Sequence, residues 1–207
     1  MHSILPFGKL VKPKVMNYPK KIDIALEKVK EITSTNDYLA HLCKESKAKE
    51  FYTVIAESQT KGKGQRGNSW ESEAGKNLTF SIFVRHHPDL KAQDQFALSD
   101  LTAQSVVEFL SRYDITSRVK LPNDIYIGMD KICGILIENT LRGNSLYSSI
   151  IGIGLNVNQT EFDPSLPNPT SMSICKKHKA FDIDECLESL IDIFKSKYYA
   201  FISAMTA

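Results

Sequence analysis

The chain lacks the features that mark membrane, secreted and metal-binding proteins. Its 207 residues contain no apolar run close to the roughly 20 residues of a transmembrane helix, and the N-terminal residues lack the apolar segment of a signal peptide. The four cysteines, Cys43, Cys133, Cys175 and Cys186, have no metal-ligand spacing, and no H-E-x-x-H motif accompanies the five histidines. These absences favour a cytoplasmic protein with reduced thiols, no membrane association and no metal site of its own.

Composition and charge set only broad bounds. The chain is 42% hydrophobic and 24% charged, as in ordinary globular proteins, and its length is typical of one domain. Its net charge is +2, but residues 1–30 hold seven lysines against Asp23 and Glu27. No aromatic residue is interleaved there in a way that suggests base stacking, so a solvated tail is the better interpretation. We expect an irregular basic lead-in over residues 1–20.

What the chain does contain is a basic, glycine-rich stretch at residues 61–70, KGKGQRGNSW. Glycines let a backbone approach an anion closely, cations neutralise phosphate or carboxylate oxygens, and a tryptophan face stacks on a planar base. The stretch from Gly62 to Gly67 matches the dinucleotide pattern G-x-G-x-x-G and nearly matches a Walker A loop. Both motifs require a helix directly after the loop, whereas a second apolar strand follows here, and Asn68 occupies the position of the Walker lysine. The stretch therefore predicts a strand-to-strand loop that handles a nucleotide.

Hydrophobic periodicity along the chain predicts an α+β fold. Residues 93–112 and the apolar repeat from Leu187 to Phe201 have the period of amphipathic helices, and N-cap residues at 33–37 precede a shorter helix. Short β-branched segments that follow one another through turns favour a mixed, largely antiparallel sheet with helices packed on it. The strands are expected at residues 27–32, 52–57, 78–84, 118–121, 124–127, 132–138 and 146–156, with a turn at 128–131, and the helix at 93–112 is expected to bury Phe96, Ala103, Val106, Val107 and Leu110.

Five short motifs resemble, in their order and spacing, the catalytic domain of biotin protein ligases. That family carries a serine-threonine-asparagine helix start, a G-R-G-R-x-G-x-x-W loop, a K-W-P-N-D turn, a K-x-x-G-I-L strand and a G-x-G-x-N segment. The resemblance covers residues 27–205 and implies the fold shared by biotin ligases and class II aminoacyl-tRNA synthetases, with a catalytic domain over 21–207. The motifs in this chain are STN at 34–36, GKGQRGNSW at 62–70, KLPND at 120–124, KICGIL at 131–136 and GIGLN at 152–156.

The resemblance implies a two-step ligation. Biotin and MgATP would give biotinyl-5′-adenylate and pyrophosphate, and the biotinyl group would then pass to a lysine of a biotin carboxyl carrier protein or domain. In the first step two anions must meet, so cations and backbone N–H groups have to offset their repulsion and the charge that develops at phosphorus. The family therefore implies biotin as substrate, ATP and Mg²⁺ as cofactors and a carboxylase carrier as partner, and it allows a homodimer.

The resemblance also assigns roles to single residues. Lys131, Lys63 and Arg66 would stabilise charge in catalysis. Residue chemistry alone leaves structural roles open, because Ser34 suits a helix N-cap and Trp70 suits a core. The biotin-binding set would be Ser34, Thr35, Asn36, Gln59, Gly62, Lys63, Gly64, Gln65, Lys131 and Gly134, and the ATP-binding set Arg66, Trp70, Asn123, Asp124, Lys131 and Asn156, with Mg²⁺ near Asn123 and Asp124.

The chain also departs from the family pattern. Gln65 and Asn68 stand where many members have arginine, and Leu121 replaces the tryptophan of the K-W-P-N-D turn. We expect neither an N-terminal winged helix-turn-helix, and hence no DNA binding, nor a C-terminal SH3-like domain. Three alternatives stay open: a lipoate or octanoate ligase or transferase of the same fold, a non-catalytic nucleic-acid-binding module, and an inactive ligase that only binds biotin.

Overall fold

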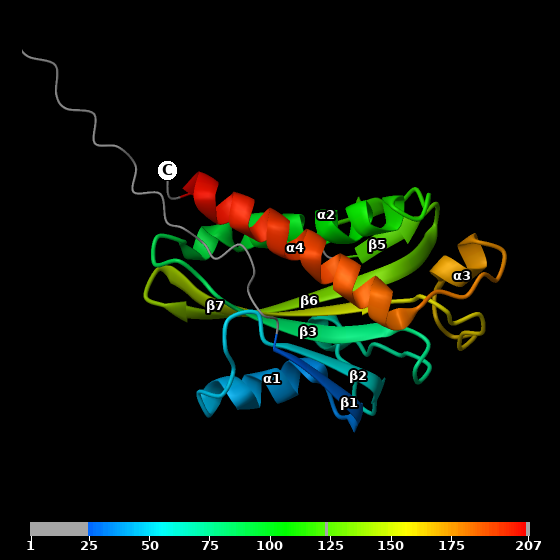
Figure 1. The fold of residues 1–207 in the computed structure, drawn as a ribbon, viewed down its shortest axis with the longest axis horizontal. Helices are drawn as coiled ribbons and strands as arrows, with labels where there is room; N and C mark the ends of the chain where they lie inside the picture. Colours follow the sequence, from blue (N-terminus) through cyan, green and yellow to red (C-terminus); the bar gives the residue numbers. More distant parts are fainter. Residues whose placement is uncertain (1–24, 123, 206–207) are drawn as a thin grey trace, which may run out of the picture.

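The computed structural model describes residues 25–122 and 124–205, which form a seven-stranded sheet with helices on both faces (Figure 1). The lead-in expected over residues 1–20, and Asn123, lie outside the described residues. The strands are β1 (Leu26–Ile32), β2 (Thr53–Gln59), β3 (Leu78–Arg85), β4 (Arg118–Lys120), β5 (Asp124–Ile127), β6 (Asp130–Arg142) and β7 (Ser145–Leu155). The helices are α1 (Thr35–Lys44), α2 (Gln95–Ser111), α3 (Met172–Cys175) and α4 (Ile183–Met205), with short 3-10 turns η1 (Gln65–Gly67) and η2 (Ala92–Asp94).

The sheet is mixed but mostly antiparallel. Its strand order is β1-β2-β3-β7-β6-β5-β4. β1 and β2 run parallel, with α1 as the crossover between them, and each of the other neighbouring pairs is antiparallel. The α+β fold expected from the sequence is therefore confirmed.

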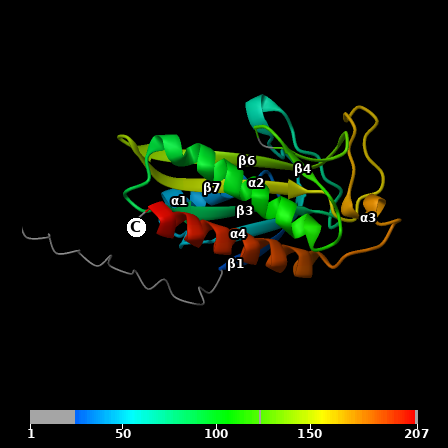
Figure 2. The same cartoon turned by 90° about the horizontal axis from the view of Figure 1, so that it is seen from above.

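The two faces of the sheet carry different side chains because successive strand residues point in opposite directions. On β3, Leu78, Phe80 and Ile82 are fully buried in the main core that α2 and α4 complete, whereas Ser81 is directed to the opposite face, toward α1. Figure 2 shows α2 and α4 crossing the sheet together. Each large apolar side chain buried there contributes roughly 1.5–3 kcal/mol. This face stabilises the fold and leaves the other face available for polar groups.

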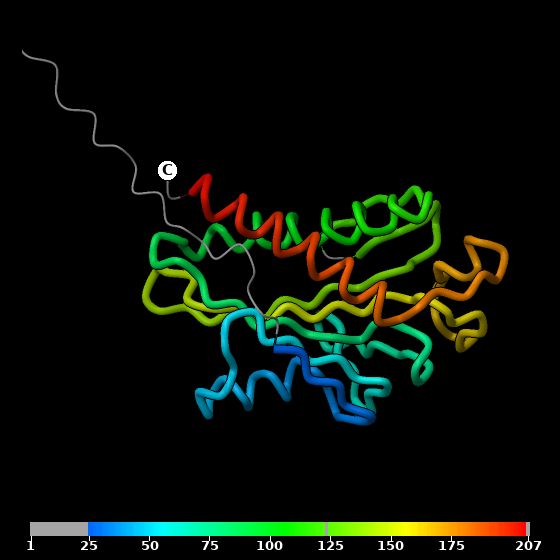
Figure 3. Tube along the Cα trace, viewed as in Figure 1, coloured from blue at the N-terminus to red at the C-terminus, as the bar shows by residue number. Residues whose placement is uncertain are grey.

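α1 covers only part of that second face. The helix begins after Ser34, whose Oγ accepts a hydrogen bond from the N–H of Asp37 in the N-cap arrangement expected from the sequence. Leu39 packs with Phe83 in a small second core beneath the helix. Figure 3 shows the trace of α1 on one side of the sheet and the trace of α4 on the other. The first turn of α1 thus lies over the middle of the sheet and contacts the polar face of β3.

Three sequence expectations were wrong in detail. α2 begins at Gln95, and Phe96 is 75% exposed because the buried stripe of the helix starts only at Leu98. β6 is longer than residues 132–138 because it stays paired with β7 along the whole hairpin. β6 also starts before Lys131, whose side chain is 31% exposed and lies within the strand, not at a solvated hairpin tip.

Candidate functional site

The floor of the candidate site is a patch of sheet without side chains. Gly134 on β6 is the cross-strand partner of Gly154 on β7, and Gly152 lies two residues earlier on the same face. The indole of Trp70 lies directly on this pair, since a Cβ added to Gly154 would be 2.7 Å from Cζ2 of the ring and one added to Gly134 would be 3.0 Å from Cζ3. A Cβ on Gly152 would likewise collide with the amide of Asn36. These glycines allow other groups to touch the backbone of the sheet.

Above this floor lies a cavity of about 120 Å³, bounded by the first turn of α1, the loop at 62–70 and the start of β6. Nine of the ten residues predicted to bind biotin line it. The exception is Gly62, which lies behind the cavity against the backbone of Trp70 and accepts a hydrogen bond from its N–H. Residues distant in sequence therefore meet here because the α1 N-terminus, β2 and β6 converge on the polar face of the sheet.

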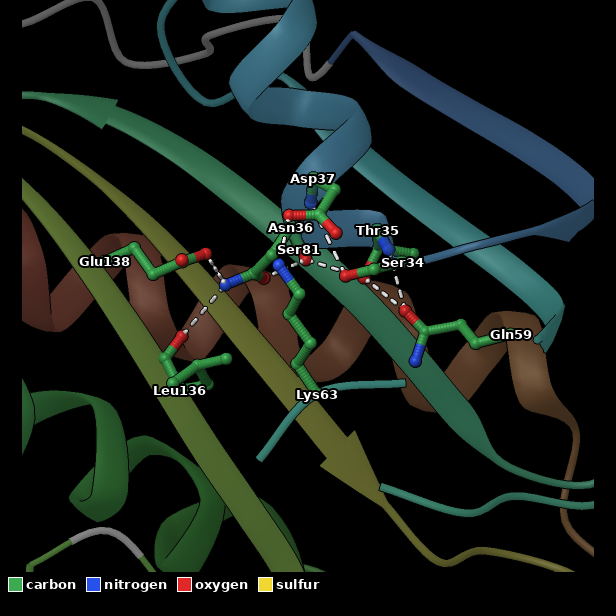
Figure 4. Close-up of polar contacts among 9 residues, drawn as sticks. All are labelled: Ser34, Thr35, Asn36, Asp37, Gln59, Lys63, Ser81, Leu136 and Glu138. Carbon is green, nitrogen blue, oxygen red and sulfur yellow. Dashed lines mark hydrogen bonds and ion pairs between the residues drawn. The ribbon is translucent and has the colours of Figure 1, made fainter. Parts of the chain in front are cut away.

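One end of the cavity is polar and internally hydrogen-bonded (Figure 4). Gln59 Oε1 accepts from the backbone N–H of Thr35 at 2.7 Å, and Thr35 Oγ1 lies 3.1 Å from the same oxygen. Ser81 Oγ lies 2.7 Å from Thr35 Oγ1 and 2.6 Å from Asn36 Oδ1. Thr35, Asn36 and Ser81 are each at least 97% buried. Their hydroxyl and amide groups therefore hold one another in place.

The glycine-rich loop forms a small hairpin of its own. Lys63 and Ser69 form an antiparallel bridge, and Gly64 N–H donates to the carbonyl of Asn68 at 2.7 Å. Lys63 Nζ lies 2.5 Å from Asp37 Oδ1, and this hydrogen bond raises the pKa of the lysine. Arg66 has φ of 57° at the turn, is exposed and lines neither this cavity nor the next. The hairpin closure thus directs Lys63 toward the cavity and Arg66 away from it.

A second cavity, of about 330 Å³, adjoins the first. Asn68, Ser69, Trp70 and Lys131 line both, so they form the wall between them. The second cavity is also lined by Asn156, which is 4% exposed and whose Nδ2 donates to the carbonyl of Thr170. Within the described residues, Asn156 Oδ1 and Trp70 Nε1 are buried without a hydrogen-bond partner. An unpaired buried acceptor and donor are costly unless water or a ligand completes them, so they make this cavity a candidate binding site.

Lys131 is the cation at the junction of the two cavities. Its Nζ lies 2.7 Å from Asp124 Oδ1 and 5.7 Å from the centre of the Trp70 ring. Its backbone is held by the loop that lines the second cavity, because its N–H donates to Asn168 and its carbonyl accepts from Thr170. A lysine fixed in this way can contact anionic groups in either cavity.

The predicted ATP set is brought together only in part. Trp70, Lys131 and Asn156 line the second cavity, and Asp124 lies at the first. The sequence interpretation missed Ser81, although the alternation of small polar with apolar residues on β3 signals a polar face. It quoted Gly152 and Gly154 as parts of the GIGLN motif but gave them no role. It also missed the proline-rich loop, which supplies Pro167 and Pro169 to the second cavity.

The described residues give no sign of a metal centre built by the protein alone or of a membrane-spanning helix. The described part of the chain contains no group of three or more histidine, cysteine or acidic side chains that could hold a metal ion by itself. Within residues 25–122 and 124–205, none of the helices combines the length and apolarity needed to cross a bilayer. The candidate site is therefore the pair of cavities that meet at Trp70 and Lys131.

The sheet topology and the paired cavities define an α+β protein of the biotin protein ligase fold. The structure of biotin protein ligase from Aquifex aeolicus in complex with biotin and ATP matches with a TM-score of 0.74 and 28% identity, covering 88% of this chain and 73% of that one. Residues 29–156 match the biotin/lipoate A/B protein ligase family. The chain belongs to that family.

Curated relatives agree with this assignment. The bifunctional ligase/repressor BirA of Bacillus subtilis is 32% identical over 172 residues, which are 81% of this chain and 52% of the relative. The human biotin–protein ligase is 38% identical over 133 residues, 61% of this chain and 18% of the relative. The chain thus spans about half or less of the length of these curated relatives.

Proposed function

We propose that the chain is an ATP-dependent biotin protein ligase, which forms biotinyl-5′-adenylate and transfers biotin to a lysine of a biotin carboxyl carrier protein or domain. The observation that carries the proposal is the junction of two cavities at Lys131 and Trp70, one with a polar, hydrogen-bonding end and one with an unpaired buried donor and acceptor. Such a junction suits a reaction that joins two bound molecules.

The polar end of the first cavity favours biotin over lipoate. A ureido ring presents N–H donors beside a carbonyl acceptor, whereas a dithiolane ring presents neither. The Gln59 side chain is held by Thr35 through Oε1, which leaves Nε2 as a donor, and hydroxyl oxygens supply acceptors. Desolvated groups of this kind reject a ligand that leaves them unpaired.

In the first proposed step, a carboxylate oxygen of biotin attacks the α-phosphorus of ATP. A carbon–oxygen–phosphorus linkage forms, the bond from the α-phosphorus to the bridging oxygen breaks, and pyrophosphate leaves. Lys131 would donate hydrogen bonds to the carboxylate and to the α-phosphate oxygens, each worth ~1.5–3 kcal/mol. Lys63 would add a second cation to the first cavity. Arg66 lies outside both cavities, so its proposed contact with phosphate requires the loop to change conformation on binding.

In the second proposed step, the neutral amine of the carrier lysine attacks the acyl carbon of the adenylate. An amide bond forms, the bond to the AMP oxygen breaks, and the amine releases its proton to solvent. The anhydride has to survive until the carrier arrives, so the loop at 62–70 and the Trp70 ring would keep water from it. The adenylate would span both cavities, so the residues that line both would contact its central, phosphate-bearing part.

Mg²⁺ would enter with the nucleotide. Among the described residues Asp124 would be its ligand, and the sequence adds the adjacent Asn123. Proteins usually bind Mg²⁺ through one or two carboxylates together with the phosphates of the substrate. The ion would supply positive charge against the phosphate oxygens. Asp124, already paired with Lys131, would position both the lysine and the ion.

We further propose a cytoplasmic location, which the four unpaired cysteines support, and a carboxylase carrier as the protein partner. As expected from the sequence, DNA is not among the proposed partners. A homodimer stays compatible with the two sheet edges, β1 and β4.

The test is a reconstituted reaction. The purified chain is mixed with biotin, MgATP and a biotin carrier domain, and mass spectrometry follows the carrier lysine; lipoate replaces biotin in a parallel reaction. We expect ATP-dependent biotin on the lysine and no lipoyl transfer. Absence of both transfer and biotin-dependent ATP–pyrophosphate exchange would overturn the proposal, and lipoyl transfer alone would replace it with the lipoate alternative.

A further inference from the structure

Glu138 lies at the end of the hydrogen-bond chain that forms the polar wall of the first cavity. It is on β6, two residues beyond Leu136 and on the same face as the glycine floor. Its Oε2 accepts a hydrogen bond from Asn36 Nδ2 at 2.7 Å (Figure 4). The same amide nitrogen lies 3.5 Å from the carbonyl oxygen of Leu136. Glu138 itself does not line the cavity, and its hydrogen-bonded link to the cavity wall is Asn36. Its charge also acts on Lys63, whose pKa is raised first by the hydrogen bond to Asp37 and less by the charge of Glu138.

An ionised carboxylate fixes which way the Asn36 amide points. A carboxylate only accepts hydrogen bonds, so the NH₂ group of Asn36 must face Glu138 and the oxygen must face Ser81. The opposite orientation would set the amide oxygen against the carboxylate at hydrogen-bond distance, which is repulsive. Asn36 is 3% exposed, so water cannot compensate for a wrong orientation.

The fixed amide sets the direction of the hydroxyl protons beyond it. Ser81 has one proton, and Asn36 Oδ1 at 2.6 Å requires it. Ser81 Oγ must then receive a proton from Thr35 Oγ1, 2.7 Å away, because two hydroxyl oxygens that close need a proton between them. The other acceptor beside this hydroxyl, Gln59 Oε1, is farther away at 3.1 Å, so the shorter contact to Ser81 takes the proton. Thr35 therefore donates inward, toward Glu138, and presents lone pairs to the cavity. Gln59 Oε1 remains held by the backbone N–H of Thr35.

We infer that Glu138 is a positioning residue. It orients the hydrogen bonds that run through Asn36 and Ser81 so that Thr35 accepts a hydrogen bond from a ring N–H of the ligand. The inference rests on the proposed function, since biotin supplies the N–H. Without the negative charge, the Asn36 amide is able to turn and the protons of Ser81 and Thr35 reverse. The Thr35 proton then points to the cavity side, toward Gln59 Oε1 at 3.1 Å, where it competes with a ring N–H of the ligand for the acceptors. Glu138 thus determines specificity for the ligand without touching it.

The test measures discrimination, which a merely structural role would leave unchanged. Isothermal titration gives the dissociation constants of biotin and of cyclic carbamate analogues in which one ring N–H is replaced by oxygen. The wild-type chain is expected to prefer biotin by tenfold or more. In Glu138→Gln, biotin affinity should fall about tenfold and the preference for biotin should narrow at least about fivefold. Glu108→Gln, the same change in an exposed ion pair on α2, should leave both unchanged.

A second variant interrupts the row of hydrogen bonds between Glu138 and Thr35. Ser81→Ala keeps Glu138 and Asn36 paired but removes the link to Thr35, so it should narrow the preference for biotin as Glu138→Gln does. Thermal unfolding of each variant separates this effect from loss of fold. If the wild type binds biotin, and both folded variants prefer biotin over the carbamate analogues as strongly as the wild type does, the role of Glu138 is overturned and the proposed function is not. Failure of the wild-type chain to bind biotin would overturn the proposed function together with this inference.

Discussion

An alanine at position 154 would place a methyl group inside the space that the Trp70 ring now occupies. The added Cβ would lie 2.5 Å from Nε1 and 2.7 Å from Cζ2 of the ring. Carbon atoms in contact prefer about 3.5–4.0 Å, so the indole has to move away from the sheet by about 1 Å. The sheet blocks any movement toward the floor. The ring must therefore shift into the space of the two cavities that it separates.

The size of the effect follows from this overlap. Forcing an extra methyl group into a packed contact costs about 1–3 kcal/mol. Because the ring is free to rise, we expect most of this cost in ligand binding and less in the stability of the fold. At 1.4 kcal/mol per factor of ten, the affinities for biotin and for ATP should each fall roughly 5- to 150-fold.

The chain provides its own reporter and its own control. Trp70 is the single tryptophan, so its fluorescence emission reports the position of the ring, and isothermal titration reports the two affinities. Gly134→Ala is the matched control, because its Cβ would lie 3.0 Å from Cζ3 of the same ring and a shift of a few tenths of an ångström relieves it. Unchanged emission and affinities in Gly154→Ala, or a larger effect in Gly134→Ala, would refute this account of the floor.

Three further outcomes are expected. Lys131→Ala should lower biotin-dependent ATP–pyrophosphate exchange at least about tenfold with the fold kept, because charge-assisted hydrogen bonds are lost; near-normal exchange would remove the lysine from its proposed role. Gly62→Ala should weaken biotin binding at least about tenfold, because its Cβ would strike the carbonyl oxygen of Trp70 and open the hairpin; binding within about twofold of wild type would contradict this. His86 should remove about 3 kcal/mol of stability as the pH drops from 6.5 to about 4, because burial lowers its pKa to about 4. Glu50 acts in the opposite direction over this range, because burial raises its pKa to about 7, so the measured quantity is the difference in urea unfolding between the wild type and His86→Gln; a difference that is independent of pH between 7 and 4 would disagree.

The sign of the His86 effect follows from its surroundings. Its ring nitrogens lie 2.9 Å from the hydroxyl of Tyr198 and 2.7 Å from that of Ser149, in a site that is 6% exposed. The folded protein keeps the ring neutral, whereas the unfolded chain takes up a proton near pH 6.5. The stabilising contribution is therefore complete above that pH and is lost as the pH falls toward the folded pKa. The stability of the wild type relative to His86→Gln should therefore fall as the pH drops from 7 to about 4.

The local parts of the site were predictable from sequence because their signals are local. Ser34 with Asp37 is an N-cap pattern, and the helix begins there as expected. The loop at 62–70 was recognised as a strand-to-strand connection because no helical pattern follows it. The strand pattern around Lys131 was found as well, and the error of two residues in its start placed the lysine at a hairpin tip.

What could not be predicted depends on contacts between distant segments. Nothing in the sequence around Gly154 shows that an indole from residue 70 lies on it. The outward position of Arg66 follows from the closure of the hairpin, which sets φ at 57°, and a motif comparison does not contain that information. Glu138 shows the same limit, since its role exists only through Asn36, which is 102 residues away in the sequence.

The charges within the site suggest how an anionic intermediate would be held. Lys63 is paired with Asp37 and Lys131 with Asp124, so each cation at the cavities already has a carboxylate partner. Gln65 and Asn68 add no charge to the loop. Binding would then depend on directed hydrogen bonds from fixed lysines more than on a positive field, because paired charges largely cancel at a distance. A field screened over about 8–10 Å at moderate salt would contribute little, so affinity for the adenylate should change weakly with ionic strength but strongly with the geometry of Lys131.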